Sequence, residues 1–225
     1  MLLKGRGSQS YSCKQQKDSD VALGQFLVAV LVLELTPGPN MAFLAALSLS
    51  RGRRAGLAAA LGVTLGLSVH AVLAALGAGA IIERSPNLYE LLRWLGVLYL
   101  LWLAFEGWRG AAETSPGTVA VLDHEMRRLF TRGLISNIFN PKSILFFTSV
   151  VPQFLSTGDP SVTTQLFIYG AIYVAVATTI HVAIVLLAAR LQPWLVAGPR
   201  RDIARRVLSV ALVGIALWLA WATQR

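Results

Sequence analysis

Long apolar runs, each ended by a short cluster of charges, constrain this chain more than any other feature of its sequence. The runs are about 20 residues long, which is the length that an α-helix needs to cross the hydrocarbon core of a bilayer. Only 14% of the 225 residues are charged, whereas a soluble domain needs about a quarter. Alternation over segments of about ten residues, typical of a membrane barrel, is not visible. The sequence therefore predicts an all-α, polytopic membrane protein.

Six transmembrane spans are predicted, and two of them are interrupted. The spans cover residues 21–49, 55–82, 88–108, 131–154, 162–189 and 203–222. The first is interrupted at residues 36–40 and the fourth at residues 137–141, where proline stands beside asparagine. Residues 1–20 are polar and lack apolar periodicity, so we expect a disordered N-terminal tail. Residues 21–225 are expected to form a single six-helix domain.

The distribution of arginine predicts the orientation. The connections after spans one, three and five contain Arg51, Arg53, Arg54, Arg109, Arg127, Arg128, Arg132, Arg190, Arg200, Arg201, Arg205 and Arg206. The positive-inside rule places these connections in the cytoplasm and both termini outside. The net charge of +9 is thus explained by topology and contact with anionic membrane lipids, without nucleic acid.

The N-terminal tail conflicts with this orientation, because its four basic residues would lie outside. Either the tail is translocated, or the natural protein begins at Val21, encoded by the alternative start codon GTG. N-terminal sequencing of the native protein distinguishes these possibilities.

Internal symmetry says more about function than the orientation does. Spans one and four each begin a set of three, and both are broken. Because three is odd, the two halves must be inverted relative to each other, and broken helices at matching positions of inverted repeats mark the binding site of transporters. The second span of each half also carries a histidine, His70 or His181.

The two breaks supply the candidate substrate-binding residues. These are Pro37, Gly38, Pro39, Asn40, Asn137, Asn140, Pro141 and Lys142. Each proline frees the carbonyl four residues before it, so both breaks are expected to face the protein interior. The exposed N-terminus of a half-helix attracts a carboxylate. A packing kink is the alternative for the breaks, and capping of the half-helices is the alternative for the asparagines.

Charged and titratable residues within the spans suggest ion coupling. Glu34 is the one acidic residue deep within a span, and such residues mark ion or proton pathways. It is a candidate for proton coupling or ammonium binding, the alternative being a hydrogen bond to a freed carbonyl. His70 and His181 are candidates for proton relay or for interhelical hydrogen bonds. Lys142 either neutralises a substrate carboxylate, pairs with Glu34, or extends to the lipid headgroups.

Several chemistries have no counterpart in the sequence. The zinc-protease pattern, the nucleophile elbow and the phosphate-binding loop are absent, and the one cysteine, Cys13, lies in the tail. We therefore expect no enzyme activity, cofactor or metal site. Uphill transport would then draw on an ion gradient, with protons the natural choice given Glu34 and the histidines.

At these motifs the chain resembles the LysE/RhtB family of bacterial amino-acid exporters, from residue 21 to the C-terminus. The motifs are Leu35-Thr36-Pro37-Gly38-Pro39-Asn40, Arg51-Gly52-x-Arg54-Ala55-Gly56-Leu57, Gly62 through His70, Gly96-Val97-x-Tyr99-Leu100, Phe130-x-x-Gly133, Asn137-x-x-Asn140-Pro141-Lys142-Ser143 and Pro152-Gln153-Phe154. The resemblance implies an inner-membrane exporter of amino acids such as threonine, homoserine or lysine, driven by proton exchange and often dimeric.

The chain departs from the family pattern at its acidic positions. Many members carry an acid two positions before the histidine of span two, where this chain has Ser68, and another in span five, where it has Ala177, Thr178 and Thr179. Glu34 is then the candidate replacement for a lost carboxylate. The alternative functions are export of a divalent cation or other small solute, an intramembrane enzyme, and a non-catalytic membrane partner.

Overall fold

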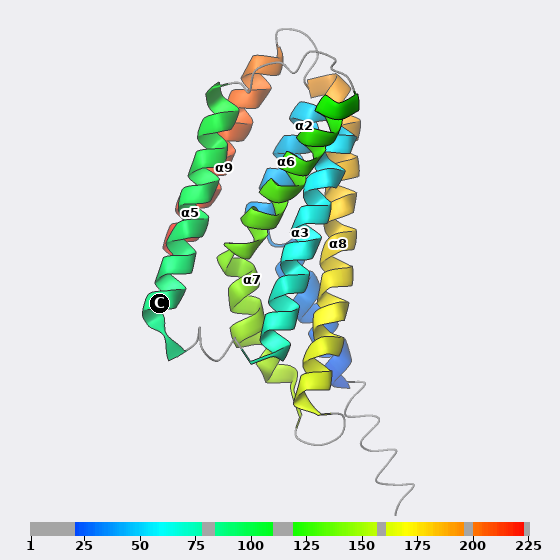
Figure 1. Ribbon diagram of the computed structural model, residues 1–225, viewed down its shortest axis with the longest axis vertical. Coiled ribbons are helices and arrows are strands. Elements are labelled where there is room, and N and C mark those ends of the chain that lie inside the picture. Colours follow the sequence, from blue (N-terminus) through cyan, green and yellow to red (C-terminus); the bar gives the residue numbers. More distant parts are fainter. Residues whose placement is uncertain (1–20, 78–83, 110–118, 157–160, 196–199, 223–225) are drawn as a thin grey trace, which may run out of the picture.

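The computed structural model describes residues 21–77, 84–109, 119–156, 161–195 and 200–222, and every regular element among them is helical. The first helix covers Val21–Leu35. It is followed by α2 (Pro39–Arg51), α3 (Arg53–Ala75), α5 (Pro86–Arg109), α6 (Val119–Ile138), α7 (Pro141–Leu145), a π-helix (Phe146–Val150), a 3₁₀-helix (Val151–Phe154), α8 (Val162–Leu195) and α9 (Arg200–Ala222) (Figure 1). The tail predicted over residues 1–20 lies outside the described residues.

Length and composition identify three helices able to cross a membrane, or up to five spans if each bent pair counts as one. The single helices are Arg53–Ala75, Pro86–Glu106 and Val162–Trp194. The bent pairs are Val21–Leu35 with Pro39–Arg51, at 51°, and Asp123–Ile138 with Pro141–Phe154, at 47°. The all-α, polytopic class is thus confirmed. The sixth predicted span is helical, but its apolar part is only Arg206–Trp218, so the count of six and the two inverted repeats stay predictions.

Three predicted boundaries were wrong. The helix of span two ends at Ala75, because Gly77 adopts φ +84° and its N–H bonds to the Ala74 carbonyl, which terminates a helix; residues 78–82 lie outside the described part. The helix of span four begins at Val119, well before residue 131, and Glu125 and Arg128 of this extension pair with neighbouring helices. The helix of span five continues beyond residue 189 to Leu195.

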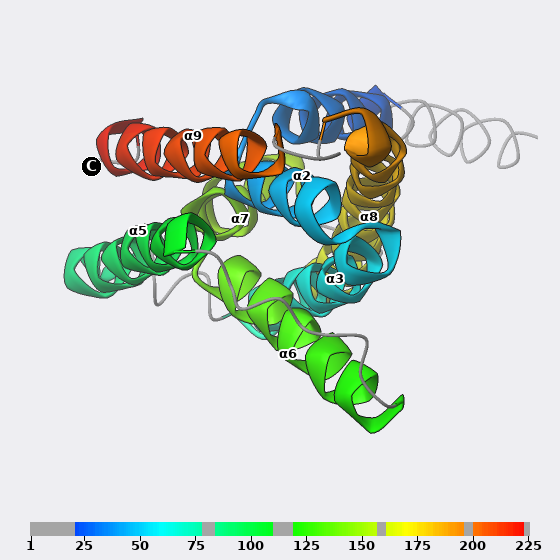
Figure 2. The same cartoon turned by 90° about the horizontal axis from the view of Figure 1, so that it is seen from above.

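The helices form a packed group and a side pair. Helix α3 packs against both α6 and α8, and α8 also packs against α2. Helices α5 and α9 pack mainly on each other and reach the group chiefly through α2 (Figures 1 and 2). Figure 1 places the α2–α3 junction, the C-terminal end of α5 and the N-terminal ends of α6 and α9 at one end of the molecule. The arginine-rich helix ends thus lie together, as the orientation rule requires.

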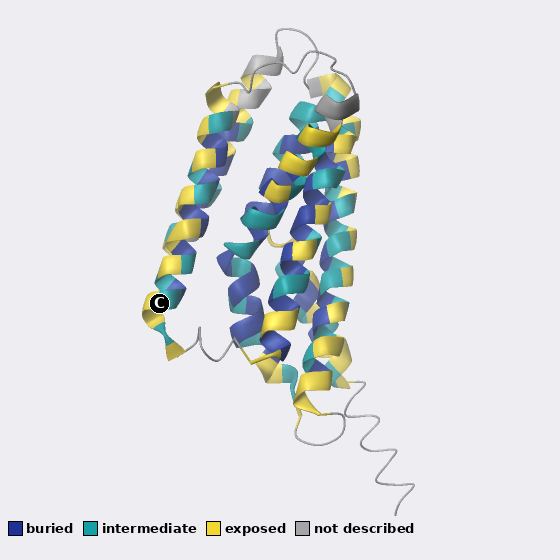
Figure 3. Ribbon diagram, viewed as in Figure 1, coloured by how far each residue is buried: buried dark blue, intermediate teal, exposed yellow. Residues whose placement is uncertain are grey.

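Large apolar side chains cover much of the outer surface. Val32 is 63% exposed, Leu98 58% and Val210 59%, and exposed residues recur along the whole length of α5 and α8 (Figure 3). Water would disfavour so much exposed apolar area, whereas lipid chains accept it.

Backbone-to-backbone contact joins α3 to α6. A Cβ at Gly62 would overlap the Phe130 carbonyl oxygen, and a Cβ at Gly133 would overlap the Ala59 carbonyl oxygen. Such small residues allow membrane helices to approach closely. The sequence motif around Gly62 therefore has a packing role.

Gly62→Ala is expected to lower the stability by about 1–3 kcal/mol, because its methyl group would meet a backbone that cannot move aside. Thermal unfolding in detergent measures the change. Gly214→Ala in α9 is the matched control, since nothing lies within 4 Å of its added Cβ. Equal stability of the two variants would contradict the assigned contact.

Candidate functional site

The two helix breaks are built by proline at the first position of a new helix. Pro39 begins α2 after the N-cap Gly38, and Pro141 begins α7 after the N-cap Asn140. Proline suits this position because its fixed φ is helical and its missing N–H would have no intrahelical partner. The Asn140 side chain accepts a hydrogen bond from the Lys142 backbone N–H at 3.1 Å, which confirms the predicted cap.

The breaks meet at a small cavity. It is lined by Glu34, Gly38, Pro39, Asn40, Met41, Leu67, Asn140, Lys142, Ser143, Tyr173 and His181. The space available to the centre of a water molecule is about 10 Å³, enough for about one water. A solute larger than water therefore requires the surrounding helices to move apart.

Glu34 is the centre of a buried polar cluster in this cavity. Its side chain is almost fully buried, and its Oε1 accepts a hydrogen bond from the Tyr173 hydroxyl at 2.8 Å. The Nε2 of His181 lies 3.5 Å from Oε2. The His181 Nδ1 is buried and has no hydrogen-bond partner among the described residues. One carboxylate, one hydroxyl and one imidazole thus share an enclosed space, with one nitrogen unpaired.

Lys142 supplies a positive charge to the same cavity. Its Nζ donates to the Thr36 carbonyl at 2.9 Å, across the first break. The predicted pairing of Lys142 with Glu34 is therefore not the contact made, because the lysine reaches the backbone beyond it. Gly38 permits this path, since a Cβ there would lie 3.2 Å from Lys142 Cδ. The cavity consequently holds opposite charges that are not bonded to each other.

His70 lies outside the cavity and contacts the second break from α3. Its Nε2 lies 3.1 Å from the Asn137 carbonyl oxygen, the acceptor that Pro141 leaves free. The Asn137 amide donates to Ser143 at 3.3 Å, while its Oδ1 has no partner within the described residues. Protein groups thus satisfy the freed carbonyl, as the sequence argument requires of a break inside a membrane.

Two details predicted for the first break were wrong. Asn40 does not cap α2, because it lies inside the helix after Gly38 and accepts instead from Ser136 at 3.4 Å. Thr36 and Pro37 do not face the interior, since both are exposed directly after the helix Val21–Leu35. Gly38, Pro39 and Asn40, by contrast, are buried.

Tyr173 is the main residue of the cluster that the sequence analysis missed. It precedes His181 by eight positions in α8, with the buried Ala177 midway, so helical periodicity places the three residues along one face. Stacking of Tyr173 on Phe146, with ring centroids 4.1 Å apart, ties it to the segment after the second break. The helical spacing to His181 was the available signal.

Metal ligands are sparse around the breaks. Throughout the described ranges, no group of three or more His, Cys, Asp or Glu side chains is placed to hold a metal ion.

Broken helices that enclose a charged cavity in a lipid-facing helical protein are typical of polytopic membrane transporters. Comparison with known sequences gives the family. The profile of the LysE type translocator family matches residues 31–223, and the chain belongs to this family.

Three named relatives are similar to this chain, and two of them are described as efflux proteins. A homoserine/homoserine lactone efflux protein of Salmonella typhimurium is 32% identical over 176 residues, which are 78% of this chain and 84% of the relative. The protein of the same description from Salmonella typhi has the same identity and coverage. An uncharacterized membrane protein of Vibrio cholerae is 35% identical over 60% of this chain and 64% of its own length. No solved structure gives a significant match.

Proposed function

We propose that the chain exports homoserine-like amino acids and their close derivatives across the bacterial inner membrane in exchange for protons. The observation that carries the proposal is the pair of opposite charges, Glu34 and Lys142, that lines one cavity without a direct bond between them. An amino acid carries the complementary pair of charges. The efflux activity of the Salmonella relatives supports the same substrate class.

The substrate carboxylate is assigned to Lys142 and the start of α2. Helix α2 has no side-chain cap on its N-terminus among the described contacts, and Asn40 and Met41 of its first turn line the cavity. Their backbone N–H groups are among those that a helix start leaves free for an anion. Four of the candidate residues lie outside the lining of the central cavity, namely Pro37, Asn137, Pro141 and His70. Their role is to shape the two breaks.

The substrate ammonium is assigned to Glu34, and this assignment also provides the coupling. A carboxylate that binds an ammonium group cannot bind a proton at the same time. Release of the amino acid outside frees Glu34 to take up a proton, and the return of that proton to the cytoplasm resets the carboxylate for the next substrate. Tyr173 and the unpaired Nδ1 of His181 are the adjacent groups through which the proton moves.

The packing of the helices supports alternating access by two related halves. Two matching halves would exchange span one with four, two with five, and three with six. The same exchange maps the α3–α8 pair and the α5–α9 pair onto themselves. Inverted repeats that move relative to each other around a central site are the general mechanism of such transporters. The dimer expected from the family resemblance stays a prediction.

Efflux from cells that lack their own exporters tests the function. Cells are loaded with dipeptides of homoserine, threonine, lysine and other amino acids, with and without this protein. We expect faster efflux of homoserine and similar amino acids, abolished by a protonophore. Efflux unchanged for every amino acid, with the protein present in the membrane, would contradict the proposal and direct the same assay to divalent cations.

A further inference from the structure

A second cavity lies between α2, α5, α6 and α9, toward the arginine-rich end of the molecule. The space for centres of water molecules is about 90 Å³, enough for several waters or a small solute. Leucines of α2, α5 and α9 form its apolar wall, and its polar lining is Ser50, Arg51, Glu106, Arg132 and Ser209. None of these residues belongs to the central cavity.

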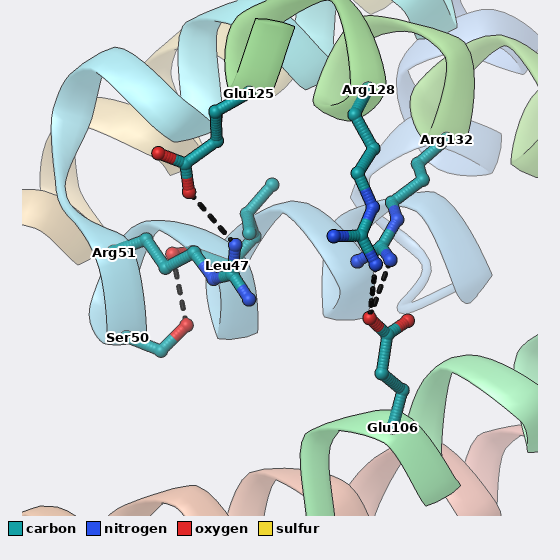
Figure 4. Close-up of polar contacts among 7 residues, drawn as sticks. All are labelled: Leu47, Ser50, Arg51, Glu106, Glu125, Arg128 and Arg132. Carbon is teal, nitrogen blue, oxygen red and sulfur yellow. Dashed lines mark hydrogen bonds and ion pairs between the residues drawn. The ribbon is translucent and has the colours of Figure 1, made fainter. Parts of the chain in front are cut away.

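Glu106 has one occupied and one vacant carboxylate oxygen (Figure 4). Its Oε1 accepts from Arg128 Nη2 at 2.8 Å and from Arg132 Nη2 at 2.5 Å. Its Oε2 is buried and has no hydrogen-bond partner among the described residues. A buried carboxylate oxygen without a donor is unfavourable. The site therefore suits a ligand that donates hydrogen bonds, and an ammonium group is the strongest such donor.

Arg51 supplies the opposite charge. Its Nη1 pairs with Glu125 at 3.0 Å, and its side chain is 26% exposed. A guanidinium has five N–H donors, so the single bond to Glu125 leaves donors for a carboxylate. The arginines Arg51, Arg128 and Arg132 exceed the carboxylates Glu106 and Glu125 by one charge. The cavity thus offers a vacant acceptor and a cation with spare donors.

We propose that this cavity is a loading site, where an amino acid from the cytoplasm binds before it reaches the central cavity. Its ammonium binds Glu106 Oε2, its carboxylate binds Arg51, and its aliphatic part packs on the leucines. The inference rests on the proposed function and adds a second substrate site to it. An anionic lipid headgroup is disfavoured because Glu106 would repel its phosphate.

Helix α2 links the two cavities. Asn40 and Met41 line the central cavity, while Phe43, two residues further along, and Arg51 line the loading site. The distance from Asn40 to Arg51 along the helix axis is about 16 Å at about 1.5 Å per residue. A solute held at Arg51 therefore needs to travel about three helical turns along α2 to reach the breaks.

Initial rates of homoserine uptake into inside-out vesicles test the loading site, because such vesicles present the cytoplasmic face to the medium. We expect Glu106→Gln to raise KM by about tenfold or more, as for loss of a charged hydrogen bond, with little change in the maximal rate. Leu212→Phe is the second variant, since it fills the cavity from α9 while leaving every charge in place. It is expected to raise KM as well.

Glu90→Gln is the matched control. It removes one carboxylate from the same helix, α5, outside the lining of both cavities, and we expect a wild-type KM. An unchanged KM in both Glu106→Gln and Leu212→Phe, or equal increases in Glu106→Gln and Glu90→Gln, would overturn the loading site while wild-type transport upholds the proposed function. Absence of homoserine transport by the wild type would overturn both. A KM increase seen only in proteoliposomes containing anionic lipid would assign the cavity to lipid instead.

Discussion

Glu34→Gln is expected to abolish uphill export of homoserine while leaving the protein folded. The glutamine carbonyl can accept the hydrogen bond that Tyr173 donates to Glu34, and the two side chains have nearly the same shape. Glutamine cannot exchange a proton, however, so the export loses its connection to the proton gradient. Counterflow of labelled against unlabelled homoserine requires no net proton movement and is expected to persist at saturating substrate.

Proteoliposomes with an imposed pH gradient provide the measurement for Glu34→Gln, and counterflow in the same preparation shows that the protein is intact. Glu90→Gln in α5 is the matched control, because Glu90 is 39% exposed, pairs with Arg93, and lies outside both cavities. Its coupled transport should equal that of the wild type. Gradient-driven accumulation retained by Glu34→Gln would remove Glu34 from the coupling mechanism.

Lys142→Met is expected to weaken homoserine binding strongly while affecting homoserine lactone much less. Loss of a charged hydrogen bond to the substrate carboxylate costs about 1.5–3 kcal/mol, which corresponds to a Kd about ten- to a hundredfold higher. The lactone has no free carboxylate, so Lys142 contributes little to its binding. Calorimetric titration of the purified protein with each compound measures the difference.

The comparison of two ligands separates substrate recognition from a purely structural role of Lys142. Its Nζ also bonds to the Thr36 carbonyl, so its removal can loosen the first break. Loosening would weaken the binding of homoserine and of the lactone alike. Equal losses for the two ligands would therefore assign Lys142 to the structure of the break and not to the carboxylate.

The sequence predicted the broken helices well because proline has fixed consequences for the backbone. Pro39 and Pro141 both begin new helices, and the resemblance to the family agreed with the profile match. The sequence also identified Glu34, Lys142 and His181 as candidate site residues, and these three line one cavity. Charges are rare inside a membrane, so each one in a span is informative without any knowledge of its partners.

The partners themselves could not be read from the sequence. Tyr173 lies 139 positions from Glu34 along the chain, and tyrosine is common in membrane helices as a packing residue. The pairing of Glu106 with Arg128 and Arg132 depends on how α5 sits against α6. The start of α6 was missed because polar residues that extend a helix beyond the bilayer resemble a loop in hydropathy.

The glycine contact between α3 and α6 has a consequence for how such a molecule can change shape. Helices that contact each other through side chains can slide when those side chains change rotamer. At Gly62 and Gly133 the contact is made by backbone carbonyl oxygens, which have no rotamers to change. Helices α3 and α6 are therefore expected to travel as one rigid lever, with the hinge at the Asn140–Pro141 break. The α5–α9 pair is held to the packed group chiefly through α2. We therefore expect the α3–α6 unit to move relative to this pair.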